Sequence, residues 1–273
     1  MDSNNRYKFI DNDEQHLHTL DLAPLIGTTS VLSVVAKPLT WWAAGKACEE
    51  LGWVNDRVKG VIVYSLEERI EKVTPVLEEI KQYTPEEYLK RLDKAYKAHS
   101  KSLGKSAKKG KDLHKELERF VKNQMITQDN AIDKTEYEPV IQPFIDWSKE
   151  NVERFLWSEG YSYSDKYWIG GGSDAGLLLK NGEYAVVDFK SSREAYDNQF
   201  WQIGGYDIQI SENGVFDRNG NQIYLLGENK ITQHIVVPFG TEPVVPVVSR
   251  EVDSNKEAFL AALILYKKIN KIQ

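Results

Sequence analysis

The stretch SDAGLLLKNGEYAVVDFK, residues 173–190, decides the fold of this chain. Two short apolar runs flank an Asn-Gly pair, which predicts a β-hairpin. Acidic residues stand near both outer ends, at Asp174 and Asp188, and Lys190 follows two positions later. Because burying charge is costly, their grouping around one hairpin indicates a function rather than packing alone.

The length of the turn determines whether these charges meet. A two-residue turn would place Asp174 opposite Phe189, on the face away from Asp188. A three-residue loop, 180–182 with a left-handed Gly182, shifts the register by one and places Asp174 opposite Asp188. We predict the three-residue loop, although a bulge at Gly176 would have the same effect. It would also gather an apolar set on the other face: Ala175, Leu177, Leu179, Ala185, Val187 and Phe189.

Two carboxylates this close repel each other and need a cation between them. A divalent metal with oxygen ligands meets that need. Lys190 beside such an ion suits a phosphate oxygen or an attacking water. The alternative is an Asp–Lys pair on the surface of an edge strand, and the apolar runs on both sides argue against it.

The rest of the chain alternates between helical and strand-like patterns. A Thr-Pro-Glu-Glu run at 84–87 is typical of a helix start, and Gly104 and Gly110 are expected to loosen the chain before the next helix. From Trp157 the pattern becomes strand-like, and 222–226 with 231–239 is predicted as a second hairpin. The expected helices cover 28–51 with an interruption at Pro38, 66–82, 84–100, 111–125, 139–156, 195–211 and 255–272. This order predicts a mixed α/β fold with a helical N-terminal portion.

Length and composition exclude several classes of protein. With 273 residues, the chain forms one large domain or two small ones. It contains no apolar run long enough to span a membrane, and its first residues lack the features of a secretory or mitochondrial leader. The only cysteine is Cys48, so an internal disulfide and a Cys-ligated zinc or iron–sulfur site are excluded. A reducing cytoplasm is the expected location.

The charge of the chain is uneven. A net charge of −6 excludes a protein that is basic throughout. Lysines nevertheless crowd one stretch at helical spacing, which predicts a basic stripe; a solvated helix face is the simpler alternative. The stripe comprises Lys94, Lys97, Lys101, Lys105, Lys108, Lys109, Lys111 and Lys115.

The hairpin and its surroundings resemble the PD-(D/E)XK nuclease superfamily. Asp174 and the Asp188-Phe189-Lys190 run match the core motif of that superfamily, with Ser173 where other members carry Pro. The RecB-like branch adds two marks, which are also present in the expected order: Gly110, His114 and Glu118 in GKDLHKELE, and Gln202 and Tyr206 in QIGGY. The segment TTSVLSVVAKPLTWW, 28–42, is similar to the opening of the mitochondrial genome maintenance exonuclease group and of related phage proteins.

The resemblance implies a fold and a metal site. The fold would be a restriction-endonuclease-like core, a mixed central sheet flanked by helices, within a single nuclease domain: a helical N-terminal portion at 1–105 and the core at 106–273. His114, Asp174, Asp188 and the Phe189 carbonyl would bind one or two Mg²⁺ or Mn²⁺ ions, with no iron–sulfur cluster. Lys190 would position or deprotonate the attacking water, or hold the phosphate.

Other residues would support this site. Glu118 would orient His114 or hold a metal-bound water, or is simply a solvated acid. Gln202 would hydrogen-bond near the metal, while Tyr206 would stack or contact phosphate unless it is a buried packing residue. Ser191 and Ser192 would donate to phosphate. Gly204-Gly205 implies the close approach of a strand or of a nucleic-acid backbone, and Trp41 or Trp42 would stack bases, with the other more buried.

The implied activity is that of a metal-dependent DNA exonuclease. It would prefer single-stranded DNA or free ends and act in replication, recombination or repair beside other proteins of those processes, in a bacterial or phage-infected cell. The alternatives are a structure-specific endonuclease of the same superfamily and an inactive nuclease fold that binds DNA or acts as a scaffold. Two further motifs are set aside: GGGSDA at 170–175 precedes a hairpin rather than a helix, and GKS at 104–106 lacks its upstream glycine.

Overall fold

The computed structural model describes residues 6–11, 16–36, 40–58, 61–126, 137–239 and 245–272. These residues divide into two compact units. The first combines 1–36 with 110–273, and the second is 37–109. The boundary between them falls within helix α5, Ala98–Ile126.

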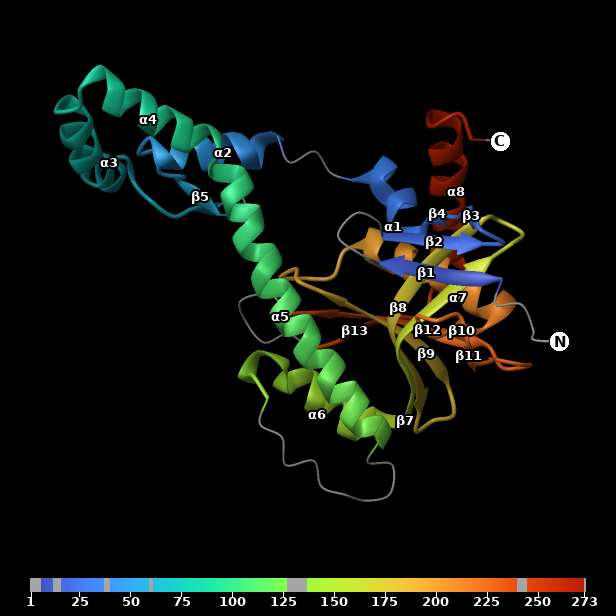
Figure 1. Cartoon of the computed structure of the whole chain (residues 1–273). Coiled ribbons are helices and arrows are strands. Elements are labelled where there is room, and N and C mark those ends of the chain that lie inside the picture. Colours follow the sequence, from blue (N-terminus) through green and yellow to red (C-terminus); the bar gives the residue numbers. More distant parts are fainter. Residues whose placement is uncertain are drawn as a thin grey trace. The chain divides into compact units, whose positions relative to one another are not determined.

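A mixed sheet forms the centre of the first unit, and among the described residues it has eight strands (Figure 1). Along the sheet the order is β11-β10-β7-β8-β9-β12-β13, and β4 pairs with β8. The β9–β12 and β4–β8 pairs are parallel and the other pairs are antiparallel. The strands are β4 Ile26–Gly27, β7 Val152–Ser164, β8 Ile169–Leu179, β9 Tyr184–Lys190, β10 Val215–Phe216, β11 Gln222–Tyr224, β12 Ile231–Pro238 and β13 Val247–Ser249.

Helices cover both faces of this sheet (Figure 1). On one face, α5 and α6, Gln142–Asn151, pack on the alternate residues of β9 that begin with Ala185. On the other face, α7, Asp197–Asn213, packs on Val186 and Val236. Because β9 is buried on both sides, a charge placed on it is held away from water. The mixed α/β class predicted from the sequence is therefore confirmed.

Two further helices and a small sheet complete the first unit. Helix α8, Val252–Ile269, packs against α7 and against the short helices α1, Thr28–Val31, and η1, Leu32–Val35. A second 3-10 helix, η2, Pro139–Ile141, leads into α6. The N-terminal sheet consists of β1 Tyr7–Asp11, β2 His16–Leu20 and β3 Ala23–Pro24.

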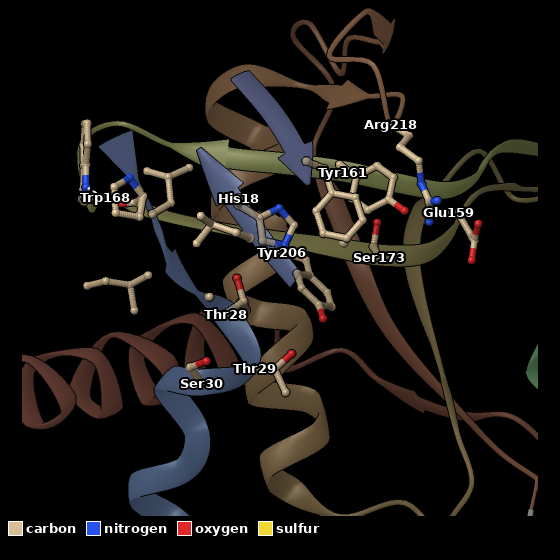
Figure 2. A pocket seen from close by; sticks show the side chains of 18 of the residues that line it. His18, Thr28, Thr29, Ser30, Glu159, Tyr161, Trp168, Ser173, Tyr206 and Arg218 are labelled. Carbon is tan, nitrogen blue, oxygen red and sulfur yellow. Dashed lines mark hydrogen bonds between the residues drawn. The ribbon is translucent and has the colours of Figure 1, made fainter. Parts of the chain in front are cut away.

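The N-terminal sheet rests on the central sheet through aromatic side chains. The rings of Phe9 and Tyr161 are stacked with their centroids 4.3 Å apart, and the Tyr7 and Tyr163 rings stack at 4.9 Å. Figure 2 shows His18 of β2 beside Tyr161 of β7 at this junction. The portion at 1–105, which was expected to be helical, therefore begins with strands that no pattern in the sequence indicated.

The second unit is mainly helical. It contains α2 Thr40–Glu50, β5 Arg57–Val58, β6 Val61–Ile62, α3 Leu66–Lys81 and α4 Pro85–Tyr96. The predicted helix start at Thr84 is confirmed: its hydroxyl accepts from the Glu87 backbone, and the Glu87 side chain caps Thr84 in return.

Three details of the prediction were wrong. Gly104 and Gly110 do not interrupt the chain, because both lie inside the continuous helix α5. The helix expected over 139–156 ends at Asn151, and 152–156 already belongs to β7. The predicted hairpin of 222–226 with 231–239 does not form, because β11 pairs with β10 while β12 pairs in parallel with β9.

The crossover explains the last error. Parallel neighbours require a long connection between them, and α7 lies between β9 and β12 in the chain. No helix within the described residues is long and apolar enough to span a membrane.

Candidate active site

The register of the β8–β9 hairpin brings the two acids together. Ala175 pairs with Val187 and Leu177 with Ala185, so the next position places Asp174 opposite Asp188. The Leu179 amide donates to the Glu183 carbonyl at 2.8 Å, which leaves 180–182 as the loop, and Gly182 has φ +83°. The predicted three-residue loop is confirmed, and the pairing between β8 and β9 shows no bulge at Gly176.

The other face of the hairpin is the apolar surface that the register predicts. All six of its side chains lie in the core under α5 and α6: Ala175, Leu177, Leu179, Ala185, Val187 and Phe189. The side chains of Asp174, Asp188 and Lys190 therefore start from the opposite side of the hairpin, where Lys190 bonds to Gln202 of α7. The apolar side chains of the hairpin hold the strands in the core, and the strands in turn fix the position of the two acids.

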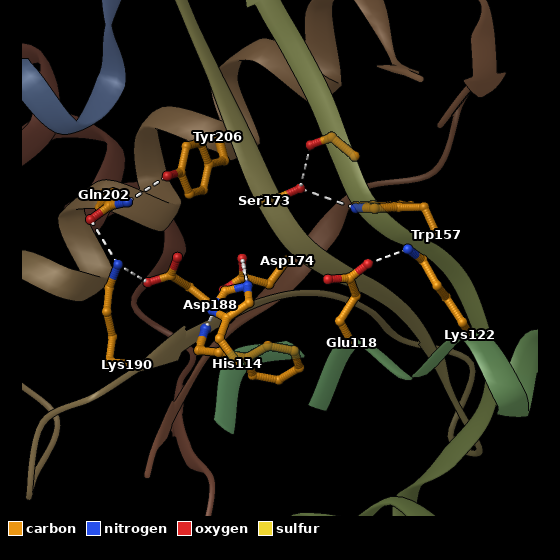
Figure 3. Close-up of polar contacts among 12 residues, drawn as sticks. His114, Glu118, Lys122, Trp157, Ser173, Asp174, Asp188, Lys190, Gln202 and Tyr206 are labelled. Carbon is orange, nitrogen blue, oxygen red and sulfur yellow. Dashed lines mark hydrogen bonds and ion pairs between the residues drawn. The ribbon is translucent and has the colours of Figure 1, made fainter. Parts of the chain in front are cut away.

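Lys190 neutralises Asp188 at the centre of the site (Figure 3). Its Nζ lies 2.5 Å from Asp188 Oδ2, and Asp188 is only 3% exposed. Burial raises the pKa of the Asp188 carboxyl to about 6; the Lys190 charge opposes this shift and the Asp174 charge adds to it. Burial alone would lower the pKa of Lys190, but the Asp188 charge more than offsets it, so that pKa is raised.

Asp174 is held from two sides. Its Oδ2 accepts a hydrogen bond from the Phe189 backbone N–H, and its Oδ1 lies 3.3 Å from His114 Nε2. In an extended strand the N–H and C=O of one residue point to the same side, so the Phe189 carbonyl also faces the Asp174 edge. The predicted set of His114, Asp174, Asp188 and Lys190 is thus brought together.

His114 reaches the site from helix α5. Its ring packs edge-on against Phe189, with the centroids 5.7 Å apart. Burial lowers the pKa of His114, but the hydrogen bond and charge of Asp174 outweigh that effect and the pKa is raised. Gly110, one turn earlier, explains how the helix comes so near: a Cβ there would lie 2.8 Å from the Ser191 Cβ.

Gln202 and Tyr206 extend the polar network from α7. Lys190 Nζ donates to Gln202 Oε1 at 3.1 Å, and Gln202 Nε2 donates to the Tyr206 hydroxyl (Figure 3). The i, i+4 spacing places both on one helix face, as predicted. Their contact in the structure is with the Lys190 ammonium, and Tyr206 is 3% exposed.

The glycines between Gln202 and Tyr206 have a packing role. A Cβ at Gly204 would lie 2.6 Å from the Asn255 carbonyl oxygen, and one at Gly205 would lie 2.7 Å from the Phe259 ring. The close neighbour is helix α8 rather than the strand or nucleic-acid backbone that the sequence suggested. The pair therefore sets the distance between two helices.

Glu118 lies one turn beyond His114 on α5. It forms an ion pair with Lys122 and lies beside Glu159, whose pKa is raised first by burial and then by the Glu118 charge. Glu159 was missed by the sequence analysis. It lies between two residues of β7 that pair with Ala175 and Ser173, so the register places it opposite Asp174.

The backbone at Glu159 explains why it was missed. Its φ is +50°, which is unusual for a residue with a side chain. A Glu-Gly step within a strand pattern is a signal for such an irregularity, but the chain position alone does not show which acid it turns towards the site.

The remaining predicted residues lie at the edges. Ser191 is exposed after β9, and Ser192 accepts from Gln199 Nε2 at 3.2 Å while donating to the Glu194 carbonyl at 2.8 Å. Trp41 is 89% exposed and Trp42 is partly buried, which confirms that the two do not share an environment.

The lysine stripe is only partly described. Lys111 and Lys115 are exposed on α5 around His114, and Lys94 pairs with Glu50 at 2.7 Å. The side chains of Lys105, Lys108 and Lys109 lie outside the described residues.

The donor set suits a divalent ion in its chemistry. Two carboxylates and an imidazole are ligands that Mg²⁺ and Mn²⁺ accept. Asp188 Oδ2 is buried and makes no hydrogen bond of acceptable geometry, although Lys190 lies close to it. The described side chains contain no group of three or more His, Cys, Asp or Glu already arranged around a common ion position. In this arrangement Lys190 pairs with Asp188, and His114 lies against Asp174.

No protein-family model matches the chain, and no curated protein sequence matches it.

Proposed function

We propose that the protein is a metal-dependent deoxyribonuclease of the PD-(D/E)XK type, acting as an exonuclease that prefers single-stranded DNA. The observation that carries the proposal is the convergence of Asp174, Asp188, Lys190 and His114 from two strands and a helix. Four groups of these types around the buried carboxylate of Asp188 are more than packing requires, because each charge withdrawn from water has a cost.

His114, Asp174, Asp188 and the Phe189 carbonyl would hold Mg²⁺ or Mn²⁺, one ion or two. Such an ion lowers the pKa of a bound water and neutralises charge on a phosphate undergoing hydrolysis. The protein's own contribution is position: the hairpin fixes both acids, and α5 brings His114 to Asp174. Helix α7 supplies the Gln202 amide that orients Lys190.

Lys190 acts as a cation in this scheme. Its raised pKa and its bond to Gln202 favour the protonated ammonium, which suits a phosphate oxygen better than it suits proton abstraction. Of the roles considered from the sequence, holding the phosphate is therefore the one that we propose.

Cleavage assays test this assignment. Wild-type protein with Mg²⁺ or Mn²⁺ should shorten end-labelled single-stranded DNA and leave circular single-stranded DNA intact, and EDTA should stop the reaction. Asp188→Asn and Lys190→Ala should each lower the rate by about a hundredfold or more. The exposed residues Glu228 and Lys230 supply matched controls, and Glu228→Gln and Lys230→Ala should cleave normally.

The two alternative functions would give different results in these cleavage assays. Cut circles would indicate an endonuclease, and the absence of metal-dependent cleavage would indicate a DNA-binding or scaffold protein. Metal binding can be measured separately from cleavage: at a hundred times its dissociation constant, Mn²⁺ should stabilise the wild-type fold by about 2.7 kcal/mol, and Asp188→Asn should lose most of that gain.

The cellular setting follows from the same proposal. We infer a cytoplasmic enzyme of replication, recombination or repair, in a bacterial or phage-infected cell, that meets DNA with free ends and other proteins of those processes. The single free cysteine, Cys48, suits a reducing compartment. Cell fractionation followed by detection of the protein tests this location.

A further inference from the structure

The cluster of Asp174, Asp188, Lys190 and His114 is called the acid–lysine site below. A cavity of about 790 Å³, whose lining is drawn in Figure 2, opens beside it. One wall comes from the N-terminal segments and the other from β8 and β7. Asp174 and Tyr206 belong both to this lining and to the site described above. The volume falls in the usual range for small-ligand pockets, so a group seated there would lie directly next to a phosphate held at Asp174.

The glycine run of β8 lets the N-terminal segment, which forms one wall of this cavity, pack directly on the strand. A Cβ at Gly170 would lie 2.8 Å from the His18 Cβ. At Gly171 it would lie 2.5 Å from Thr28 Oγ1 and 2.7 Å from Tyr206 Cε1. Side chains on this strand would therefore push away the N-terminal segment that forms the opposite wall. The GGG motif at 170–172, which fits no dinucleotide site, thereby has a structural role: it allows the N-terminal segment to lie close to β8.

The chemistry of the lining is that of a site for an uncharged, planar, polar group. Arg218 is the only Lys or Arg among the described lining residues, and two acids, Glu159 and Asp174, stand at one end. A path for several phosphates would need more cations than this. The lining instead offers hydroxyl groups and aromatic rings; Trp168 is the more exposed ring, at 36%, whereas Tyr161 already stacks on Phe9.

The hydroxyls differ in their availability. Thr28 Oγ1 is used within the fold, since it donates to the Gly170 carbonyl at 3.1 Å and accepts from Gln209 Nε2 at 2.6 Å. Thr29 and Ser30 are exposed and line the same cavity (Figure 2). A hydroxyl can donate and accept, which matches the mixed edge of a nucleobase.

We propose that this cavity receives the base and sugar of the nucleotide adjoining the phosphate to be cut, a proposal that rests on the proposed nuclease function. The base stacks on the aromatic lining and meets the hydroxyls of Thr29 and Ser30. Base stacking tolerates any sequence, so the cavity recognises the presence of an unpaired base rather than its identity.

Binding in EDTA tests this assignment without any cleavage. The probe is a fluorescein-labelled single-stranded oligothymidylate in which one abasic nucleotide is moved position by position from each end. Anisotropy with the wild-type chain should show one position where loss of the base weakens binding about tenfold. Thr29→Phe, which fills the cavity from an exposed position, should bind the intact probe as weakly and should no longer detect the abasic nucleotide.

The control is Ser254→Phe, a similar enlargement at an exposed position of α8 outside the cavity, and it should retain the wild-type pattern. A flat abasic series, no measurable binding, or an unchanged pattern in Thr29→Phe overturns the proposal. The two proposals can be told apart. If the effect of the abasic nucleotide depends on its position but the protein never cleaves DNA, the base site stands and the nuclease function is wrong. If the protein cleaves DNA but the abasic series is flat, the nuclease function stands and the base site is wrong.

Discussion

At the scale of single residues, Glu183 shows how the hairpin turn is secured. Arg250 donates to both of its oxygens, at 2.7 and 3.0 Å, and Asn181 and Gln233 donate to Oε2 at 2.6 and 2.5 Å. The hydrogen bond from Arg250, followed by that from Asn181, lowers the pKa of Glu183 to about 2. One carboxylate thus joins the turn to strand β12 and to Arg250, the residue that follows β13.

We predict that this carboxylate stabilises the fold in a defined pH window. Its folded pKa of about 2 lies below its ordinary value of 4.5, so the contribution is complete above pH 4.5 and disappears as the pH falls through about 2. Glu183→Gln should therefore melt below the wild type at pH 7, and the two melting temperatures should converge in acid. A gap that stayed constant from pH 7 to pH 2, as Glu228→Gln should show, would contradict this account.

The residues of the site were accessible from the sequence to different degrees. Asp174, Asp188 and Lys190 follow from one local choice, the length of a turn, and His114 follows from the resemblance. The position of Glu159 depends on knowledge that no local pattern supplies. The register of β7 against β8 shifts between Val152 and Arg154 and again between Phe155 and Trp157, and these shifts set which residue lies opposite Asp174.

At the scale of elements, local signals and tertiary contacts compete. The capping residues of α3 and α4 place those helices correctly, because each cap acts within a few residues of itself. Strand β12 was assigned to the wrong partner, because its turn-like neighbours suggested a hairpin. Its near-complete burial is instead typical of a central strand with a parallel neighbour.

Glycines inside helices show the same competition between local helix propensity and tertiary packing. One of them, Gly204 of α7, leads to a prediction. Gly204→Ala should destabilise the protein by about 1–3 kcal/mol, the usual cost of overpacking, because its Cβ would press on the backbone of α8 at Asn255. Urea denaturation monitored by circular dichroism measures this change. Because α7 also carries Gln202, its displacement should weaken any cleavage activity as well.

Gly104 provides the matched control. It also lies inside a helix, but a Cβ there would meet nothing within 4 Å. Gly104→Ala should therefore leave stability unchanged or raise it by about 1 kcal/mol, the helix propensity difference. Equal losses from both substitutions would show that close packing on α8 is not the reason for Gly204.

At the scale of the whole molecule, the N-terminal segment belongs to the same compact unit as the candidate site. Residues 1–36 belong to the same compact unit as 110–273, whereas 37–109 forms a unit of its own. A division into consecutive segments, such as 1–105 and 106–273, does not describe this arrangement. Sequence patterns mark where elements begin and end, but not that the strands at 7–27 pack on β7 and β8 more than a hundred residues later.

The distribution of charge over the whole molecule leads to a last prediction. The protein is acidic, with a net charge of −6, so attraction to a phosphate backbone depends on local lysines. Lys111 and Lys115 lie four residues apart on α5, on either side of His114. On single strands each phosphate contact adds about 0.7 to the slope of log affinity against log salt. Lys111→Gln/Lys115→Gln should therefore reduce that slope by up to about 1.4.

The measurement is a salt titration of oligothymidylate binding in EDTA, which separates charge from metal-dependent cleavage. The control, Lys166→Gln/Lys230→Gln, removes the same total charge from exposed positions away from α5. If the net charge governed binding, both double variants would lower affinity alike, because the field of the whole protein would change by the same amount. If the lysines beside His114 contact the strand, only their variant loses slope. An equal slope in all three proteins would show that the strand approaches the acid–lysine site from another side.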